Sequence, residues 1–437
     1  MFKKILPINL IISLRFLGLF IVLPVLSVYA LNLKNSNEFL VGITIGGYAL
    51  TQMLLQVPFG MLSDKIGRKR TLVFGLAIFA VGSLVCAYSS DIYTLILGRL
   101  LQGAGAIGAV ATAMISDMVK EEQRAKAMAI MGGSIAVTFA LSMVIGPFIG
   151  GHYGVDKLFF ITALLAIIGI FIIFKKLPNP PKITHDYQTN KRDIFIILKD
   201  VNLLRMNITN MLQKGMMTLA FLIIPIIMVK EFDFYKSELW KVYLPAMLFG
   251  VLAMGVSAVL GEKKKKPKLV LIIGIILFAL SYALMGIAHT PLIFILGVVL
   301  FFVGFNIHEP LLQSLASKYA KIHQKGTALG LFNSFGYLGT FIGALWGGHI
   351  LKWYGVEYIS IVIVVICFLW IILIATLQNP IFSKNLYVEL KESNNNNLKN
   401  LNSIDGIIEW YVNENEKVLV IKYNSKKIDE ERIKSLI

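Results

Sequence analysis

The sequence predicts an all-α polytopic membrane protein that carries a small soluble α/β domain at its C-terminus. Hydrophobic residues make up 57% of the 437 residues, the mean hydropathy is +0.73, and charged residues reach only 15%, whereas a soluble domain carries about 25%. Apolar runs of about 20 residues recur along the chain, and each is long enough to cross a bilayer core as a helix. An ordinary soluble fold is therefore excluded.

We expect twelve transmembrane helices arranged as two six-helix bundles. Helices suit this environment because they satisfy their own backbone hydrogen bonds inside lipid. The first six spans are placed near 6–31, 39–62, 71–88, 92–115, 125–150 and 158–175. The second six are placed near 206–229, 239–260, 269–287, 292–316, 326–350 and 357–377.

The loops between these spans differ in charge on the two sides of the membrane. Because basic loops stay in the cytoplasm, their pattern predicts an inner-membrane protein with both termini cytoplasmic. The net charge of +17 therefore belongs to these loops rather than to a nucleic-acid-binding face. The basic segments are Lys3 with Lys4, 65–70, 120–126, 175–205, 263–268 and 318–325.

An internal repeat divides the membrane part into two halves. The fifth span contains SMVIGPFIGG from Ser142, and the eleventh contains the similar GTFIGALWGG from Gly339. Two related halves around a central site are typical of secondary transporters. We expect an N-terminal bundle over 1–177, a proline-rich cytoplasmic linker over 178–204, a C-terminal bundle over 205–380 and a cytoplasmic domain over 386–437.

The segment 386–437 has the pattern of a small α/β domain. LYVELK, GIIEWYV and KVLVIKY alternate like strands, and NNNNLKNL and IDEERIKSLI read as helices. This β-α-β-β-α order resembles a ferredoxin-like fold without its last strand. Its role is open between binding a cytoplasmic solute, binding the basic loops and homodimerisation through its strand edges. The domain has no cysteine, and Cys86 and Cys367 lie in apolar runs, so we expect no metal site.

Three motifs resemble those of the major facilitator superfamily. GMLSDKIGRKR, from Gly60 to Arg70, resembles the loop signature between the second and third helices of that family. RLLQGAG, from Arg99, resembles the fourth-helix motif, and the fifth-span motif resembles that of the drug/proton antiporters, with Ser142 in place of the usual glycine. The resemblance covers nearly the whole chain and implies the two-bundle fold and secondary transport.

The loop after the second span is interpreted as a conformational switch. The resemblance implies that Asp64 contacts the start of the eleventh helix near Gly326, and that Arg68 pairs with Asp117. Such contacts are expected when the cytoplasmic side is closed, and they would set the balance between inward and outward states. The alternative is a solvated topogenic loop. The residues assigned to the switch are Gly60, Asp64, Gly67, Arg68, Lys69, Arg70 and Asp117.

Few ionisable residues lie inside the spans, and each is a functional candidate because burial in lipid is costly. Glu309 is the candidate proton carrier, since a carboxyl group removed from water binds a proton more readily. Its neighbour His308 points about 100° away on the helix, and is assigned either to coupling or to an interhelical hydrogen bond. Arg99 is assigned to coupling or to a polar contact between helices.

A central cavity is expected between the two halves. Arg15 and Lys214 occupy nearly equivalent positions of the repeat, which suggests that both line it. Each polar candidate is equally explained by an interhelical hydrogen bond. The cavity candidates are Arg15, Tyr48, Gln52, Gln56, Lys214, Asn306, Gln313, Asn333 and Tyr337, and the helix-packing candidates are Gly146, Pro147, Gly150 and Gly151.

These features predict a secondary active transporter that exports a small amphipathic compound or metabolite in exchange for protons, driven by the proton gradient without a cofactor. Uptake by symport or facilitated diffusion is one alternative, and a transporter-like sensor that uses the C-terminal domain is another. No enzymatic site is expected, because no nucleophile with a base, phosphate loop or metal cluster is found. The expected partners are a small-molecule substrate, protons and the lipid bilayer. Arg15, Arg99 and Lys214 suit an anion and Glu309 suits a cation, which leaves the substrate charge open.

Overall fold

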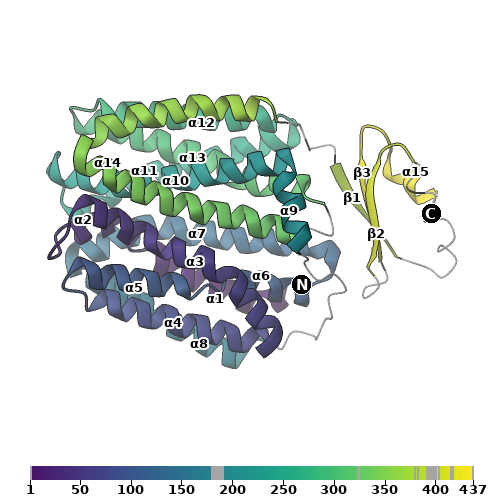
Figure 1. The fold of residues 1–437 in the computed structure, drawn as a ribbon, viewed down its shortest axis with the longest axis horizontal. Helices are drawn as coiled ribbons and strands as arrows, with labels where there is room; N and C mark the ends of the chain where they lie inside the picture. The colour runs from purple at the N-terminus through teal and green to yellow at the C-terminus, as the bar shows by residue number, and fades with distance from the viewer. Residues whose placement is uncertain are drawn as a thin grey trace.

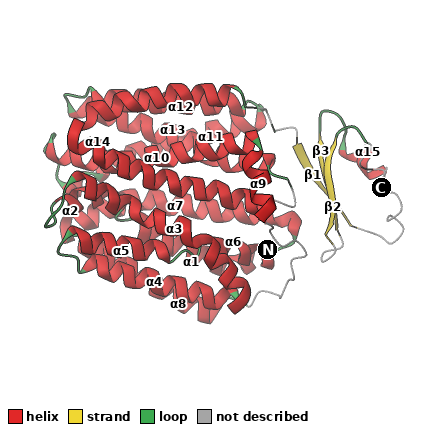
Figure 2. Cartoon of the chain, viewed as in Figure 1, coloured by secondary structure: helices red, strands yellow, loops and turns green. Residues whose placement is uncertain are grey.

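The computed structural model describes residues 2–178, 191–321, 325–377, 380, 383–389, 401, 404–413 and 418–435. The helices form two bundles that lie side by side, and a small three-stranded sheet projects from one end of them (Figures 1 and 2). The predicted fold class is therefore confirmed.

The first bundle contains six spans. The first span is interrupted between α1 (Phe2–Phe20) and α2 (Leu23–Leu31), where Pro24 stands in the first turn of α2 and needs no hydrogen-bonding N–H. Asn37 caps the second span, because its side chain accepts the N–H of Leu40 at 3.0 Å. The remaining helices are α3 (Glu38–Ile66), α4 (Arg68–Ala87), α5 (Ile92–Ala104) with α6 (Gly108–Met118) as the fourth span, α7 (Glu121–Tyr153) and α8 (Val155–Lys176).

The second bundle contains the other six spans. Its helices are α10 (Val201–Lys230), α11 (Trp240–Ser257) between the short turns η1 (Lys236–Glu238) and η2 (Ala258–Lys263), α12 (Pro267–Gly286), α13 (Pro291–Tyr319) and α14 (Lys325–Ala375). The 51 residues of α14 are too many for one crossing. The helix breaks at Gly355, so α14 supplies both the eleventh and the twelfth span.

Single glycines turn the chain between consecutive spans at three places. Gly67, Gly154 and Gly355 have φ values of 98°, 97° and 76°, a region that side chains with a Cβ rarely adopt. Gly67 belongs to the loop motif, so its presence there has a backbone explanation independent of any switching role.

The C-terminal bundle begins slightly before the predicted residue 205. The Asp200 side chain accepts the N–H groups of Asn202 and Leu203 at 2.9 and 3.0 Å, which caps α10 at Val201. Ahead of it, the short helix α9 (Lys191–Lys199) occupies part of the segment predicted as a linker.

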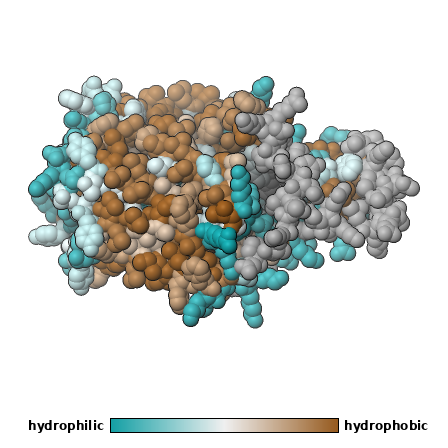
Figure 3. All heavy atoms as spheres, turned by 60° about the horizontal axis from the view of Figure 1, so that its bottom comes forward, coloured by the Kyte–Doolittle hydropathy of each residue, from teal (hydrophilic) through white to brown (hydrophobic). Residues whose placement is uncertain are grey.

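The outer surface of the bundles is apolar and its ends are polar. Figure 3 shows brown side chains along the length of the bundles and teal side chains at the ends. Large apolar residues such as Phe174, Leu252 and Trp353 are 73%, 70% and 64% exposed. Exposed apolar surface of this extent is expected to face lipid.

The C-terminal domain is an antiparallel sheet with strand order β1-β3-β2. Its described elements are β1 (Ser383–Glu389), β2 (Ile407–Asn413), β3 (Val418–Asn424) and α15 (Glu430–Ser435). Leu419, Ile421 and Ile433 are fully buried between the sheet and α15. The helix predicted between the first two strands lies mostly outside the described residues, and homodimerisation through the strand edges stays a prediction.

This domain contacts both bundles at the end that carries the basic loops. The Tyr411 hydroxyl and the Asn413 amide, both on β2, donate to the Glu121 carboxylate at the start of α7. Lys422 on β3 donates to the carbonyl oxygens of Lys318 and Ala320 at 2.8 and 2.7 Å, at the end of α13. Burial and the negative charge of Glu121 raise the pKa of Tyr411, so its hydroxyl remains a donor at neutral pH.

Replacing Lys422 is expected to loosen the domain from the second bundle. Lys422→Met removes a buried ammonium group that satisfies two helix-terminal carbonyls, with an expected cost of about 1–2 kcal/mol of docking energy. Spin labels at Lys264→Cys, exposed at the basic end of the second bundle, and Glu431→Cys should then give a broader distance distribution. Lys434→Met is the control, because Lys434 pairs with Glu430 of its own helix; equal broadening in both variants would contradict the assigned contact.

Candidate functional site

The two bundles are joined at the end opposite the basic loops by a seam of small residues on α3 and α14. A Cβ on Gly42 would overlap the carbonyl oxygen of Ala344, and a Cβ on Gly348 would lie 2.6 Å from the Glu38 carbonyl oxygen. A Cβ on Gly46 would approach that of Ala344 to 2.7 Å. Small residues therefore let the two backbones touch here, as they do in closely packed membrane helices.

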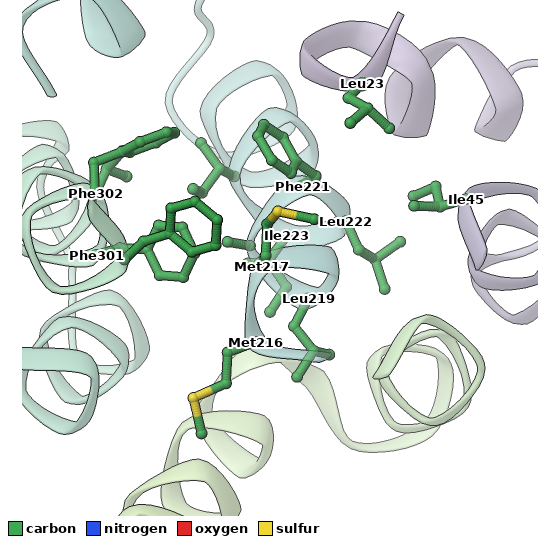
Figure 4. Packing of buried hydrophobic residues seen from close by; sticks show 14 of the residues in the cluster. Leu23, Ile45, Met216, Met217, Leu219, Phe221, Leu222, Ile223, Phe301 and Phe302 are labelled. Atoms are coloured by element: carbon green, nitrogen blue, oxygen red, sulfur yellow. The ribbon is translucent and has the colours of Figure 1, made fainter. Parts of the chain in front are cut away.

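Next to this seam, apolar side chains fill the space between the bundles. Figure 4 shows Leu23 and Ile45 of the first bundle facing α10, which carries Met217 and Phe221. The ring of Phe139 also lies 6.0 Å from that of Phe221 across the interface. A small pocket remains, lined by Leu23, Ile45, Tyr48, Met217, Thr218, Phe221 and Thr340.

Toward the basic end, the helices of the interface lose these contacts. A Cβ built on Gly132 or Gly133 of α7, Gly255 of α11, or Gly326 or Gly330 of α14 would meet nothing within 4 Å. The bundles are therefore in contact through the seam at one end, whereas these glycines at the basic end face open space.

An ion pair lies within the second bundle at mid-height. The Lys214 ammonium group on α10 donates to both carboxylate oxygens of Glu309 on α13, at 2.9 and 2.7 Å, and lies 5.0 Å from the Phe305 ring. The amide of Gln213 also donates to Glu309, at 3.1 Å. The side chains of Lys214 and Glu309 are 23% and 38% exposed, and charged groups at this depth are expected to face the protein interior or a water-filled cavity rather than lipid. A Cβ on Gly336 would lie 3.4 Å from Lys214 Cγ, which places the pair against α14.

A polar chain crosses from the first bundle to the second beside this pair. Arg15 Nη2 donates to Gln52 Oε1 at 2.9 Å, and Gln52 Nε2 donates to the Tyr337 hydroxyl at 2.8 Å. Arg15 is 1% exposed and Gln52 is fully buried. Tyr337, at the end of the hydrogen-bonded series from Arg15, directly follows Gly336, which lies against Lys214. The hydrogen-bonded series and the ion pair therefore meet at the same turn of α14.

Arg99 is held inside the first bundle. Its Nε donates to the Thr44 carbonyl oxygen at 3.2 Å and its Nη1 donates to Gln102 at 2.7 Å. Its guanidinium lies 4.8 Å from the centre of the Tyr48 ring, and Gln102 in turn donates to Ser83 at 2.9 Å. Arg99 therefore supports α3, the helix that carries Tyr48 and Gln52.

His308 lies on the side of α13 away from Glu309. Its Nε2 donates to the Leu271 carbonyl oxygen at 2.7 Å, and its ring packs against Phe278 and Trp370. The side chain is fully buried. This geometry favours the interhelical hydrogen bond over a role in coupling.

The other cavity candidates are dispersed. Asn306 donates to the Phe302 carbonyl oxygen of its own helix at 2.8 Å and lies against Gly250 of α11. Gln56 is buried near Gly108 within the first bundle. Gln313 is exposed and Asn333 is half-buried. The structure therefore brings together Arg15, Tyr48, Gln52, Lys214, Glu309 and Tyr337, and leaves these four outside that group.

The loop after the second span forms an ion-paired cluster inside the first bundle. Arg68 Nε donates to Asp117 at 3.0 Å, and its Nη1 lies 2.5 Å from both Ser63 Oγ and Asp64 Oδ1. Asp64 is 62% exposed, and its pairing with Arg68 replaces the expected contact with the helix near Gly326. The expected Arg68–Asp117 pair is present, and both residues belong to one bundle; that the contact depends on closure of the cytoplasmic side stays a prediction. Lys69 is half-buried, Arg70 is exposed, and Gly60 lies near Ala109.

The second bundle has a corresponding cluster with reversed charges. Glu262, at the end of the eighth span, pairs with Lys318 and accepts a hydrogen bond from Ser314 at 2.5 Å, both on α13. In the first bundle the loop supplies the cation, whereas here it supplies the anion. Arg68 thus ties the start of the third span to the fourth, and Glu262 ties the end of the eighth span to the tenth.

The fifth-span glycines pack in two directions. A Cβ on Gly146 would overlap the Ile21 carbonyl oxygen at the break in the first span, and one on Gly150 would lie 2.8 Å from Leu158. A Cβ on Gly151 would overlap the backbone of Ser237 in the other bundle. Pro147 lies within α7, which continues as one helix to Tyr153.

Comparison with known proteins agrees with this architecture. The model of the Major Facilitator Superfamily matches residues 8–344. The chain belongs to this superfamily. It is 36% identical over 422 residues to the inner membrane transport protein YajR of Escherichia coli K12, covering 95% of this chain and 93% of that protein. It is 27% identical to the class B tetracycline resistance protein of Escherichia coli, covering 76% and 86% of the two chains. Among solved structures, the nucleoside transporter NupG superposes with a TM-score of 0.68 at 15% identity, covering 86% and 98% of the two chains.

Membership in the superfamily accounts for the site as part of a membrane transporter. Several contributing residues were not singled out from the sequence. Gln213 precedes Lys214 and gave no separate signal, and Glu121 and Lys422 looked like ordinary surface charges. The spacing Gly42-x-x-x-Gly46 was a detectable sign of close helix packing.

Proposed function

We propose that the protein is a proton-driven antiporter of the inner membrane that exports a small amphipathic compound by alternating access. The observation that supports this most is the partly exposed Lys214–Glu309 pair within the second bundle. A carboxylate that is paired when ionised, and that loses its partner when a helix moves, can bind and release a proton at different stages of the cycle.

The membrane orientation follows from the basic loops. With these loops and both termini in the cytoplasm, the separated end of the bundles faces the cytoplasm and the glycine seam faces the periplasm. The conformation is then inward-open, the state in which an exporter receives its substrate. The similarity to the class B tetracycline resistance protein supports export as the direction of transport. The name of YajR, an inner membrane transport protein, states no substrate.

Everted membrane vesicles test this proposal and separate it from the alternatives. Their lumen is acidified by respiration, and compounds are added to the exposed cytoplasmic face. Antiport is expected to move protons out of the lumen and to reduce a fluorescent signal of the pH gradient, relative to vesicles lacking the protein. Further acidification would indicate symport, and an unchanged gradient across a panel of cationic, neutral and anionic compounds would favour a facilitator or sensor and overturn antiport.

A further inference from the structure

Arg15 is a buried cation whose hydrogen-bonding capacity is largely unused. It is 1% exposed, and Gln52 accepts a hydrogen bond from its Nη2. Among the described residues, its Nε and Nη1 have no hydrogen-bond partner. The guanidinium lies 5.5 and 5.3 Å from the ring centres of Phe16 and Phe79, close enough for cation–π attraction. These contacts do not replace a counter-ion, because removing a charge from water is costly unless the charge is paired.

The charges around the centre of the protein do not cancel. Glu309 neutralises Lys214, so this pair adds no net charge. In the part of the chain that the structure describes, none of the ion pairs includes Arg15 or Arg99. The centre therefore carries an uncompensated positive charge. The sequence left the charge of the substrate open, and this positive charge favours an anionic ligand.

The two arginines differ in what is left for a ligand. Arg99 uses two of its nitrogens to hold Thr44 and Gln102 within the first bundle. Arg15 uses one, on Gln52, and Gln52 also reaches Tyr337 of the second bundle. Arg15 is therefore the arginine that is linked to the interface between the bundles, and two of its nitrogens have no hydrogen-bond partner among the described residues.

Apolar surface lies one helical turn from this polar chain. Tyr48 precedes Gln52 by four residues on α3, so the two lie on the same face of the helix. Tyr48 lines the small pocket together with Ile45, Met217 and Phe221. A ligand whose acidic group reaches Arg15 would thus place its apolar part against these side chains.

We propose that the transported substrate is an amphipathic organic anion whose carboxylate, sulfonate or phosphate group binds Arg15 and Gln52. This inference rests on the proposed transport function and specifies its substrate class. An acidic group can accept two charge-assisted hydrogen bonds from a guanidinium. Binding would therefore give hydrogen-bond partners to these two nitrogens and neutralise the buried charge, without occupying Glu309, the proposed proton carrier.

Thermal unfolding of the purified full-length protein in a neutral detergent tests the substrate class without a proton gradient. The probes are benzoate, benzenesulfonate and phenyl phosphate, compared with benzamide and benzyltrimethylammonium. At saturating concentration at least one anion is expected to raise Tm by about 2 °C or more, whereas the neutral and cationic probes are not. The shift should vanish in Arg15→Gln and persist in Lys352→Gln, which removes one exposed positive charge from α14 far from the site.

Arg15→Lys provides a second test of the proposal if Arg15→Gln does not fold. It preserves the charge but not the paired geometry of the guanidinium, so anion binding should weaken about tenfold rather than disappear. Anion shifts that are equal in wild type and Arg15→Gln, shifts with benzyltrimethylammonium alone, or no shift with any of the three anions would overturn the proposal.

The vesicle assay keeps this inference separate from the antiport proposal. Anion binding in detergent without any proton movement in vesicles would leave the substrate class standing and remove antiport. Proton exchange driven only by cationic compounds would support antiport and overturn the anionic substrate class.

Discussion

Gly42→Val is expected to open the seam between the bundles and shift the protein away from the conformation in which α3 and α14 touch. The added side chain would overlap the Ala344 carbonyl oxygen, which belongs to backbone and cannot rotate aside. Overpacking of this kind costs about 1–3 kcal/mol, and 2 kcal/mol shifts the conformational equilibrium about 30-fold. The penalty falls on the state in which α3 and α14 touch, so the other states gain population.

Distances between spin labels at the seam end measure this shift. Labels at Tyr93→Cys on α5 and Leu292→Cys on α13 report across the bundles, and Cys86 and Cys367 are buried and thus shielded from labelling. Gly133→Val is the matched control, because a Cβ there meets nothing within 4 Å. An unchanged distance in Gly42→Val, or the same increase in both variants, would show that the seam does not control the closed state.

Removing either member of the Lys214–Glu309 pair is expected to abolish coupled exchange, and removing both is expected to restore stability without restoring coupling. Glu309→Gln leaves the ammonium group without its counter-ion, and Lys214→Met leaves the carboxylate alone. Each change should destabilise the protein by about 1 kcal/mol, less than for a fully buried pair because water screens the charges. The proton-coupled rate should fall by about 100-fold or more, since the proton carrier or its partner is missing.

A double-mutant cycle separates the effect on stability from the effect on coupling. Tm and the vesicle pH gradient are measured for the two single variants and for Lys214→Met with Glu309→Gln. The exposed Lys241–Glu238 pair on the outside of the second bundle, with a distance of 2.6 Å, is the control and should leave coupling unchanged. Additive losses of stability in the double variant, or coupled exchange that survives in Glu309→Gln, would contradict the assigned role of the pair.

The contacts around α13 show which features of the site the sequence pattern predicts and which it does not. Glu309 and His308 were both identifiable as costly charges or polar groups within an apolar run, and the helix period showed that they face different directions. The pattern did not show which direction leads to water. That depends on Leu271 and Trp370 on one side and on Lys214 on the other, residues far away in the chain.

The charge state around Arg15 likewise depends on residues that are distant in the sequence. Its sequence neighbourhood marks it as an unusual intramembrane cation but does not say whether a carboxylate neutralises it. The answer requires the positions of every acidic residue in the folded chain, because screening inside lipid is weak and a counter-ion must be close. Only the packed structure shows that the nearby carboxylate of Glu309 is already paired with Lys214.

Residue patterns alone predict the membrane-spanning class, the number of spans, the superfamily and the small C-terminal domain. These follow from local properties: hydrophobic length, helix and strand periodicity, and motifs whose residues are contiguous. Tertiary structure decided which end of the bundles is closed, how Glu309 and Arg68 pair, where His308 points and how the C-terminal domain contacts both halves. These features depend on contacts between segments distant in sequence, and alternating access requires that several such arrangements be close in free energy for one and the same sequence.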